Sequence, residues 1–171
     1  MGILTRLIDK VLFAVLFIVT LQVPVLNQQY LQYLNGYLDA TGEEIAHYAR
    51  LANDHGYSSV NVMIEALLNN ETALVRDDAQ HKLAVIEAYN EAQFASQYLQ
   101  QANYFEQVGY FVQPNQYPRL QSVINVFEPS LPLQPESVGS ALVTALVIYL
   151  FPWTGVALIR RRRRAKQRHF V

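Results

Sequence analysis

Two carboxylate and histidine pairs share the spacing of metal-binding helices. Glu44 precedes His47 by three residues, and Asp78 precedes His81 by three. Di-iron bundles take such pairs from facing helices, together with two further carboxylates. At about 100° per residue, His47 lies roughly 160° round its helix from the apolar seam, and His81 roughly 140°. Both histidines therefore fall on the polar side, and we expect solvated side chains and no metal site.

No other grouping of reactive side chains suggests catalysis. The sequence has no Gly-rich phosphate loop, no nucleophile elbow and no Ser/His/Asp grouping. It contains no cysteine, which excludes disulfides, thiolate zinc sites and cysteine nucleophiles. We therefore predict a protein that is not an enzyme and uses no cofactor.

The charge distribution is strongly uneven. Of the 171 residues, 51% are hydrophobic and 16% charged, and the net charge is −1. That total is a cancellation: residues 11–159 hold four basic and thirteen acidic side chains, and residues 160–171 hold seven basic and no acidic ones. Such asymmetry argues against an ordinary soluble domain.

Two uncharged stretches predict membrane helices, residues 11–26 and 138–159. At 1.5 Å per residue they span about 24 Å and about 33 Å, against a hydrocarbon core of roughly 30 Å. The first is followed by no small-residue cleavage site, so we expect an anchor and not a cleaved signal peptide. Basic residues flank both outer ends, which predicts cytoplasmic termini and residues 27–137 on the opposite side.

The basic run Arg160, Arg161, Arg162, Arg163 and Arg164 has two interpretations. It is either a topology signal that contacts anionic lipid in general, or a specific headgroup or RNA site. Aromatic interleaving is lacking apart from Phe170, so we expect no nucleic-acid partner.

The middle of the chain has a helical pattern. A first helix should end at Asn53–Gly56, with Gly36 and Gly42 as places for a break or a close helix contact. A short helix begins at Ser58 or Ser59. A long helix should follow over residues 71–110 and needs a partner, from this chain or another. A Pro-rich spacer, residues 128–135, then leads back to the membrane.

Polar and small residues near the apolar stretches are candidates for helix contacts. Gln22 lies at the outer end of the first stretch and either reaches the interface or bonds a neighbouring helix. Small residues cluster in the outer half of the second stretch, where helices can approach closely: Gly139, Ser140, Ala141, Thr144 and Ala145.

One run of residues carries a family resemblance. The segment 22–39 contains Gln28, Gln29, Tyr30 and a Gly-x-x-Asp step, Gly36 to Asp39, and 127–132 reads Phe-Glu-Pro-Ser-Leu-Pro with Phe127 and Pro129. Together they resemble the bacterial family called domain of unknown function 2937, over nearly the whole chain. The resemblance implies a bacterial membrane location with an outer-facing helical domain, and no reaction or ligand. We expect the segments at Gln28 and Phe127 to pack together at the outer interface.

These observations predict an all-α integral membrane protein with two transmembrane helices and an extramembrane helical hairpin containing one long helix. Its expected parts are a cytoplasmic N-terminus (1–10), a first span (11–26), a periplasmic helical domain (27–137), a second span (138–159) and a basic cytoplasmic tail (160–171). The expected function is a non-enzymatic inner-membrane accessory or scaffold protein, assembling as a homo-oligomer or with a membrane partner. The alternative is a lipid- or small-hydrophobe-binding membrane module. Membrane lipids are expected partners in either case.

Overall fold

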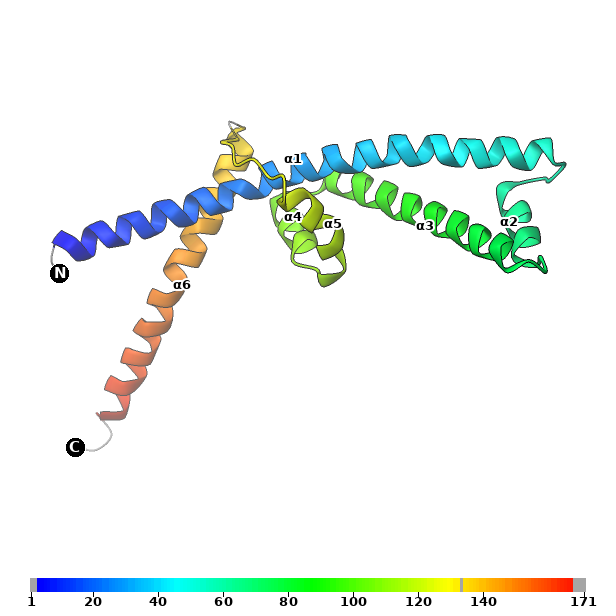
Figure 1. The fold of residues 1–171 in the computed structure, drawn as a ribbon. Coiled ribbons are helices and arrows are strands. Elements are labelled where there is room, and N and C mark those ends of the chain that lie inside the picture. The colour runs from blue at the N-terminus through cyan, green and yellow to red at the C-terminus, as the bar shows by residue number, and fades with distance from the viewer. Residues whose placement is uncertain (1–2, 133, 168–171) are drawn as a thin grey trace.

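The computed structural model describes residues 3–132 and 134–167, and within them the side chains of residues 7–132 and 134–151. These residues form helices and no strands, so the all-α prediction is confirmed. The elements are α1 (Ile3–Asp54), α2 (Val60–Leu68), α3 (Ala73–Gln101), α4 (Tyr104–Phe111), η1 (Pro114–Gln116), α5 (Tyr117–Ile124) and α6 (Pro135–Gln167) (Figure 1).

Helix α1 is one continuous helix of 52 residues, about 78 Å long. It includes the first apolar stretch and continues through Pro24, so that stretch is not a separate helix. The expected weak points do not break it: Gly36 has no atom near its missing Cβ, and a Cβ at Gly42 would meet Tyr89 at an ordinary 3.7 Å. Neither glycine is a close helix contact, and α1 continues through both despite a helix penalty of about 1 kcal/mol per glycine.

The hairpin turn follows the sequence pattern closely. Gly56 has φ +77°, a left-handed conformation that suits glycine after a helix end. The Ser59 hydroxyl then accepts a hydrogen bond from the Val62 amide and caps α2. Near the turn, Tyr48 is buried and its hydroxyl donates to Glu44. Burial, and then the hydrogen bond with the Glu44 carboxylate, raise the pKa of Tyr48 to about 12.

Helix α3 returns alongside α1, so the long helix finds its partner within the chain (Figure 1). The prediction of one helix over 71–110 is wrong in length, because α3 ends at Gln101. The chain restarts as α4 with Asn103 as its cap: the Asn103 side chain accepts from the amide of Glu106, and the Glu106 carboxylate accepts from the amide of Asn103. This reciprocal capping box begins a new helix.

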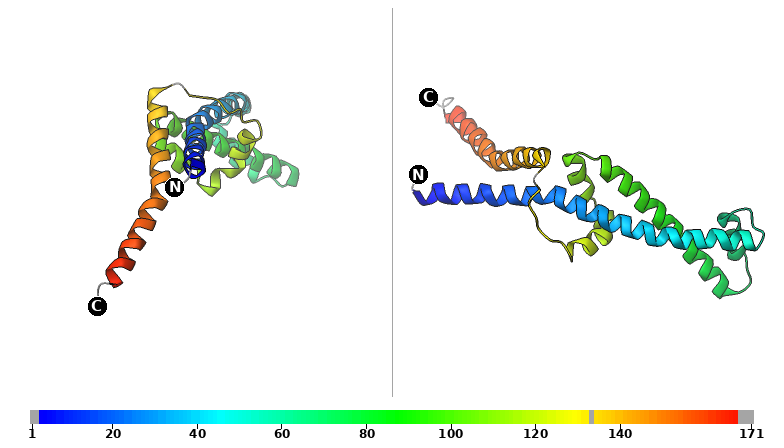
Figure 2. Two further views of the ribbon diagram at one scale, coloured as in Figure 1. Left: turned by 90° about the vertical axis from the view of Figure 1, so that its left-hand side faces the viewer. Right: turned by 90° about the horizontal axis from the view of Figure 1, so that it is seen from above.

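Helices α4 and α5 flank α1 where the hairpin begins, and the chain then crosses α1 to reach α6 (Figure 2). Beneath them lies the main core, which includes Tyr30, Leu34, Ala95, Leu99 and Leu120. Helix α6 packs on α1 through Ala141 and Ala145, both fully buried.

Among the described residues, one helix is long and apolar enough to cross a membrane, α1 from Leu7 onward. Seven apolar side chains in its N-terminal part are more than half exposed: Leu7, Ile8, Val11, Leu12, Val15, Ile18 and Val19. In α6 the described apolar part runs from Pro135 to Phe151, which is shorter than a full span.

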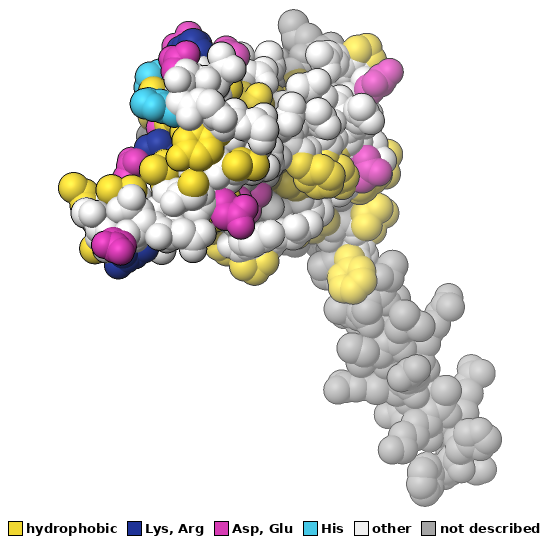
Figure 3. All heavy atoms as spheres, turned by 90° about the vertical axis from the view of Figure 1, so that its right-hand side faces the viewer, with side chains coloured by type: hydrophobic (Ala, Val, Ile, Leu, Met, Phe, Trp, Pro, Cys, Tyr) yellow, Lys and Arg dark blue, Asp and Glu magenta, His cyan; other side chains and the backbone are white. Residues whose placement is uncertain are grey.

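The histidines of the two carboxylate pairs are exposed, as the face arithmetic predicts. Histidine side chains lie at the surface near the hairpin tip, among charged and apolar groups (Figure 3). No cluster of three potential metal ligands occurs among the side chains that the structure describes.

Candidate functional site

A collar surrounds α1 between Thr20 and Tyr30, at the foot of the hairpin. We define the collar as α4, the 127–132 segment and the first turns of α6, residues 135–145. Each part contacts α1 through a side chain or backbone group described below. The collar joins the apolar part of α1 to the helical domain.

The first contact repairs a gap that Pro24 makes in α1. Proline has no N–H, so Pro24 leaves the carbonyl of Thr20, four residues earlier, without its usual helical donor. The Tyr104 hydroxyl of α4 donates to that Thr20 carbonyl at 2.9 Å. Both residues are buried. We call this contact the Tyr104 brace; it satisfies a carbonyl that would otherwise be buried without a donor.

Thr20 also connects α1 to α6. Its hydroxyl lies 2.9 Å from the Phe17 carbonyl of its own helix and 3.2 Å from the Ala141 carbonyl of α6. This approach is possible because Ala141 carries only a methyl group.

The 127–132 segment is held to α1 by two glutamines. Gln29 forms a reciprocal pair with the backbone of Glu128: its amide nitrogen donates to the Glu128 carbonyl at 2.8 Å, and its oxygen accepts from the Glu128 amide at 3.3 Å. Gln22 donates to the Ile18 carbonyl at 3.1 Å and to the Ser130 carbonyl at 3.4 Å. The two glutamine side chains of α1 therefore hold the 127–132 segment through its backbone groups. These hydrogen bonds fix the segment in place although it forms no helix or strand.

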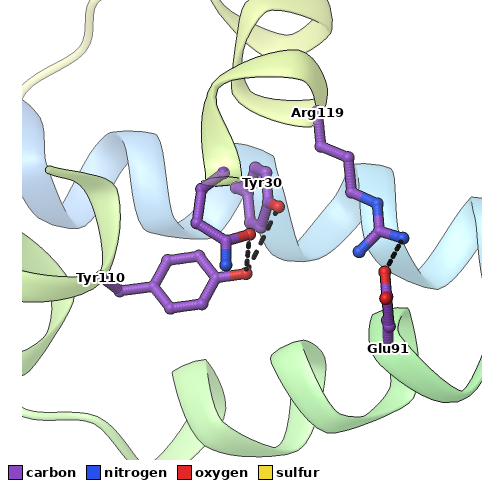
Figure 4. Close-up of polar contacts among 5 residues, drawn as sticks. Tyr30, Glu91, Tyr110 and Arg119 are labelled. Carbon is purple, nitrogen blue, oxygen red and sulfur yellow. Dashed lines mark hydrogen bonds and ion pairs between the residues drawn. The ribbon is translucent and has the colours of Figure 1, made fainter. Parts of the chain in front are cut away.

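An aromatic cluster lies next to these contacts, on the hairpin side of the collar. Its centre is Tyr30, which is fully buried. The Tyr30 ring packs edge-to-face against the rings of Tyr110 and Phe111, with distances between ring centroids of 6.0 Å and 5.5 Å. The Tyr110 hydroxyl donates to Gln116 at 2.8 Å and lies 3.5 Å from the Tyr30 hydroxyl (Figure 4). Burial raises the pKa of both the Tyr30 and the Tyr110 phenols, so both are neutral near pH 7. The cluster is a packed core with satisfied hydroxyls.

An open groove lies between α3 and the η1–α5 region beside this cluster. Arg119 of α5 and Glu91 of α3 form an ion pair of 2.8 Å across it (Figure 4). The groove has a volume of about 760 Å³, and its lining includes Phe94, Tyr98 and Tyr110. The Glu91 side chain is exposed, yet it connects α3 to α5 through this ion pair.

A second, more polar hollow of about 580 Å³ lies between α1, α4 and α6. Asn27 donates to the Leu99 carbonyl at 3.4 Å and Gln107 to the Ala102 carbonyl at 3.0 Å, which orients both amides. Their oxygens are buried and have no hydrogen-bond partner among the described residues. Gln28, which is exposed, is among the residues that line the hollow.

The structure separates the candidate interaction residues into two groups. Gln22, Gln29 and Tyr30 lie in the collar region, and the half-buried Phe127 and exposed Pro129 belong to the segment that crosses α1. Gly36 and Asp39 are exposed farther up α1, and the Asp39 side chain makes no hydrogen bond or ion pair with any described residue.

The small residues of α6 differ in their surroundings. Gly139 is exposed with open space where a Cβ would lie, so it makes no close contact with the described residues of this chain. Ser140 and Thr144 are half-buried, and the Thr144 hydroxyl donates to the Ser140 carbonyl at 2.8 Å. Ala141 and Ala145 form the actual contact face. The side chains of Arg160–Arg164 lie outside the described residues.

Sequence reasoning missed Tyr104, Asn27 and the pairing of Arg119 with Glu91. One signal was available: Asn103 followed three residues later by Glu106 is a helix-start pattern, and it would have placed Tyr104 at the beginning of a helix. Nothing in the sequence alone links Tyr104 to Thr20, 84 residues away.

The fold and the collar define a class: an all-helical protein in which one long helix carries an exposed apolar segment at one end and a helical hairpin at the other. The family model described as "Protein of unknown function (DUF2937)" matches residues 4–165, and the chain belongs to that family. The resemblance seen in the sequence is thereby confirmed. Comparison with curated proteins and with solved structures gave no match.

Proposed function

We propose that the protein is a non-enzymatic accessory or scaffold protein of the bacterial inner membrane that holds a helical hairpin on the periplasmic side. The observation that carries the proposal is the continuity of α1 from the exposed apolar stretch to the hairpin tip. From Asn27 to Asp54 the helix extends about 42 Å beyond that stretch. A rigid projection of this kind suits presentation of a surface to a partner at a fixed distance.

The proposed topology rests on charge. The two uncharged stretches, 11–26 and 138–159, would both cross the bilayer, with both termini in the cytoplasm and residues 27–137 in the periplasm. The seven basic residues of 160–171 favour the cytoplasmic side and contact with anionic lipid.

Single-cysteine labelling tests this topology, since the chain has no cysteine of its own. Asp39→Cys, at an exposed position of α1, should react with a membrane-impermeant maleimide in intact spheroplasts. Val171→Cys should react only after permeabilisation. Labelling of both variants in intact spheroplasts, or of Val171→Cys alone, would overturn the proposal.

Assembly is tested by purifying the full chain in mild detergent and measuring its native mass. A homo-oligomer, or a second membrane protein at fixed stoichiometry, supports the scaffold function. A monomer with one bound lipid supports the alternative function instead.

That alternative, a lipid- or small-hydrophobe-binding module, is favoured by the groove beside the aromatic cluster. Its volume of about 760 Å³ falls within the usual range of small-molecule sites, roughly 300–1,000 Å³. Phe94 offers an apolar wall that is 72% exposed. If this function holds, Phe94→Glu should abolish the lipid adduct in the native mass measurement.

A further inference from the structure

We infer that the first turn of α4, with the side chain of Phe105, lies in the outer lipid interface and forms a second contact between the domain and the bilayer. The inference rests on the proposed membrane anchorage of α1 and α6. It concerns an interaction surface whose partner is the boundary between lipid headgroups and acyl chains.

The position of the outer boundary follows from the pairing of α1 with α6. The two helices run in opposite directions: the ring of Phe13 lies 5.5 Å from that of Tyr149, and the Thr20 hydroxyl contacts the Ala141 carbonyl. The helices cross obliquely (Figure 1), so we count outward from the Thr20–Ala141 contact: Leu26 is six residues farther along α1 and Glu136 is five residues away along α6, at similar distances from the crossing. Leu26 ends the apolar run of α1, because the polar residues Asn27, Gln28 and Gln29 follow it, and Glu136 is the last charged residue before the uncharged run of α6. Two helices thus indicate the same boundary plane.

The collar extends below this plane. Thr20 is six residues deeper than Leu26, or about 9 Å along the helix. Since the Tyr104 hydroxyl bonds to the Thr20 carbonyl, the start of α4 is held close to this level. Segments that lie in a membrane interface bury their apolar side chains by roughly 5–10 Å. The start of α4 therefore lies within the interfacial zone.

Phe105 is the side chain placed to use this position. Its ring packs edge-on against Tyr104 at 5.5 Å, yet it is 61% exposed in the described chain. Leu131, in the 127–132 segment that crosses α1, is also 68% exposed. The residue before it, Ser130, accepts a hydrogen bond from Gln22 of α1 through its carbonyl, which holds Leu131 near the same level. Exposed apolar side chains at this depth gain contact with acyl chains, which stabilises the placement.

Tryptophan fluorescence in lipid vesicles tests the inference. Trp153 is the only tryptophan of the chain and is first replaced by phenylalanine. Into this background are introduced, one at a time, Phe105→Trp, Val15→Trp as a marker of the bilayer interior, and Leu74→Trp as an exposed control. Leu74 is 76% exposed in the first turn of α3, beside α2 at the hairpin tip, and does not line the groove next to the aromatic cluster.

Each full-length variant is reconstituted in phosphatidylcholine vesicles brominated either near the carbonyl end or near the methyl end of the acyl chains. Emission from position 105 should be blue-shifted, with a greater loss from carbonyl-end bromine. Emission from position 15 should be quenched, and emission from position 74 should be unchanged. Loss of emission at position 15 without loss at position 105 overturns the inference but leaves the membrane anchorage intact. No loss of emission at position 15 overturns the anchorage itself, and equal loss at positions 74 and 105 overturns the inference.

Discussion

The Tyr104 brace makes a prediction that a double-mutant cycle tests. Tyr104→Phe keeps the ring but removes the hydroxyl that donates to the Thr20 carbonyl at 2.9 Å. Because Pro24 provides no N–H and Thr20 is buried, the carbonyl would then have no donor. Leaving a buried acceptor unsatisfied costs about 1–3 kcal/mol of unfolding free energy.

The second arm of the cycle is Pro24→Ala. Alanine supplies an N–H that can bond to the Thr20 carbonyl within the helix, so the hydroxyl becomes redundant. Tyr104→Phe should therefore cost much less in the Pro24→Ala background, with a coupling of about 1–2 kcal/mol between the two sites. A coupling of about 1.4 kcal/mol corresponds to about a tenfold change in the folding equilibrium.

The assay is denaturant unfolding of the full chain in one mild detergent, followed by near-ultraviolet circular dichroism. Tyr98→Phe is the control, since the Tyr98 side chain is 40% exposed; it should change the free energy of unfolding little. An equal cost of Tyr104→Phe in both backgrounds would refute the idea that the hydroxyl replaces the donor missing at Pro24.

Four further changes have defined outcomes. Leu34→Ala, at a fully buried core position, should lower the free energy of unfolding by about 2–5 kcal/mol, and a loss below about 1 kcal/mol in denaturant titration would contradict the core assignment. Ala141→Leu should overpack the α1–α6 contact by about 1–3 kcal/mol in the same titration, whereas Gly139→Leu should be tolerated; the reverse order would mean that the packed face is wrong. Asn103→Ala should cost about 1 kcal/mol, and an unchanged denaturation midpoint would show that the capping box does not matter. Because the folded state raises the pKa of Tyr48 from 10.0 to about 12, its contribution to stability should be complete below pH 10 and lost as pH rises toward 12; Tyr48→Phe should remove that part of the alkaline loss.

Local signals predicted much of the chain correctly. Glycine at position 56 and serine at position 59 marked the end of α1 and the start of α2, because each satisfies a backbone requirement within a few residues. The expectation that Gln29 and the Phe127 region lie near one another agrees with the observed bonds to Glu128, although their place at a membrane interface remains a prediction.

The sequence did not reveal the long-range contacts, and one local signal went unused. Pro24 leaves the Thr20 carbonyl without a helical donor, and the donor that replaces it, Tyr104, comes from a distant part of the chain. The small residues of α6 look alike in the sequence, and only the packing of α6 on α1 turns Ala141 and Ala145 inward and leaves Gly139 exposed. The end of α3 at Gln101 was predictable from Asn103 and Glu106.

The continuity of α1 has a mechanical consequence. Under the proposed anchorage, the part of α1 that extends about 42 Å beyond the apolar stretch acts as a lever, so a tilt of roughly 10° at the membrane would move the hairpin tip by about 7 Å. Transmembrane helices change tilt with the thickness of the surrounding bilayer. With Pro24 braced by Tyr104, such a tilt would reach the tip with little bending at the proline. The position of α2 would then report the local thickness of the bilayer in which α1 is anchored.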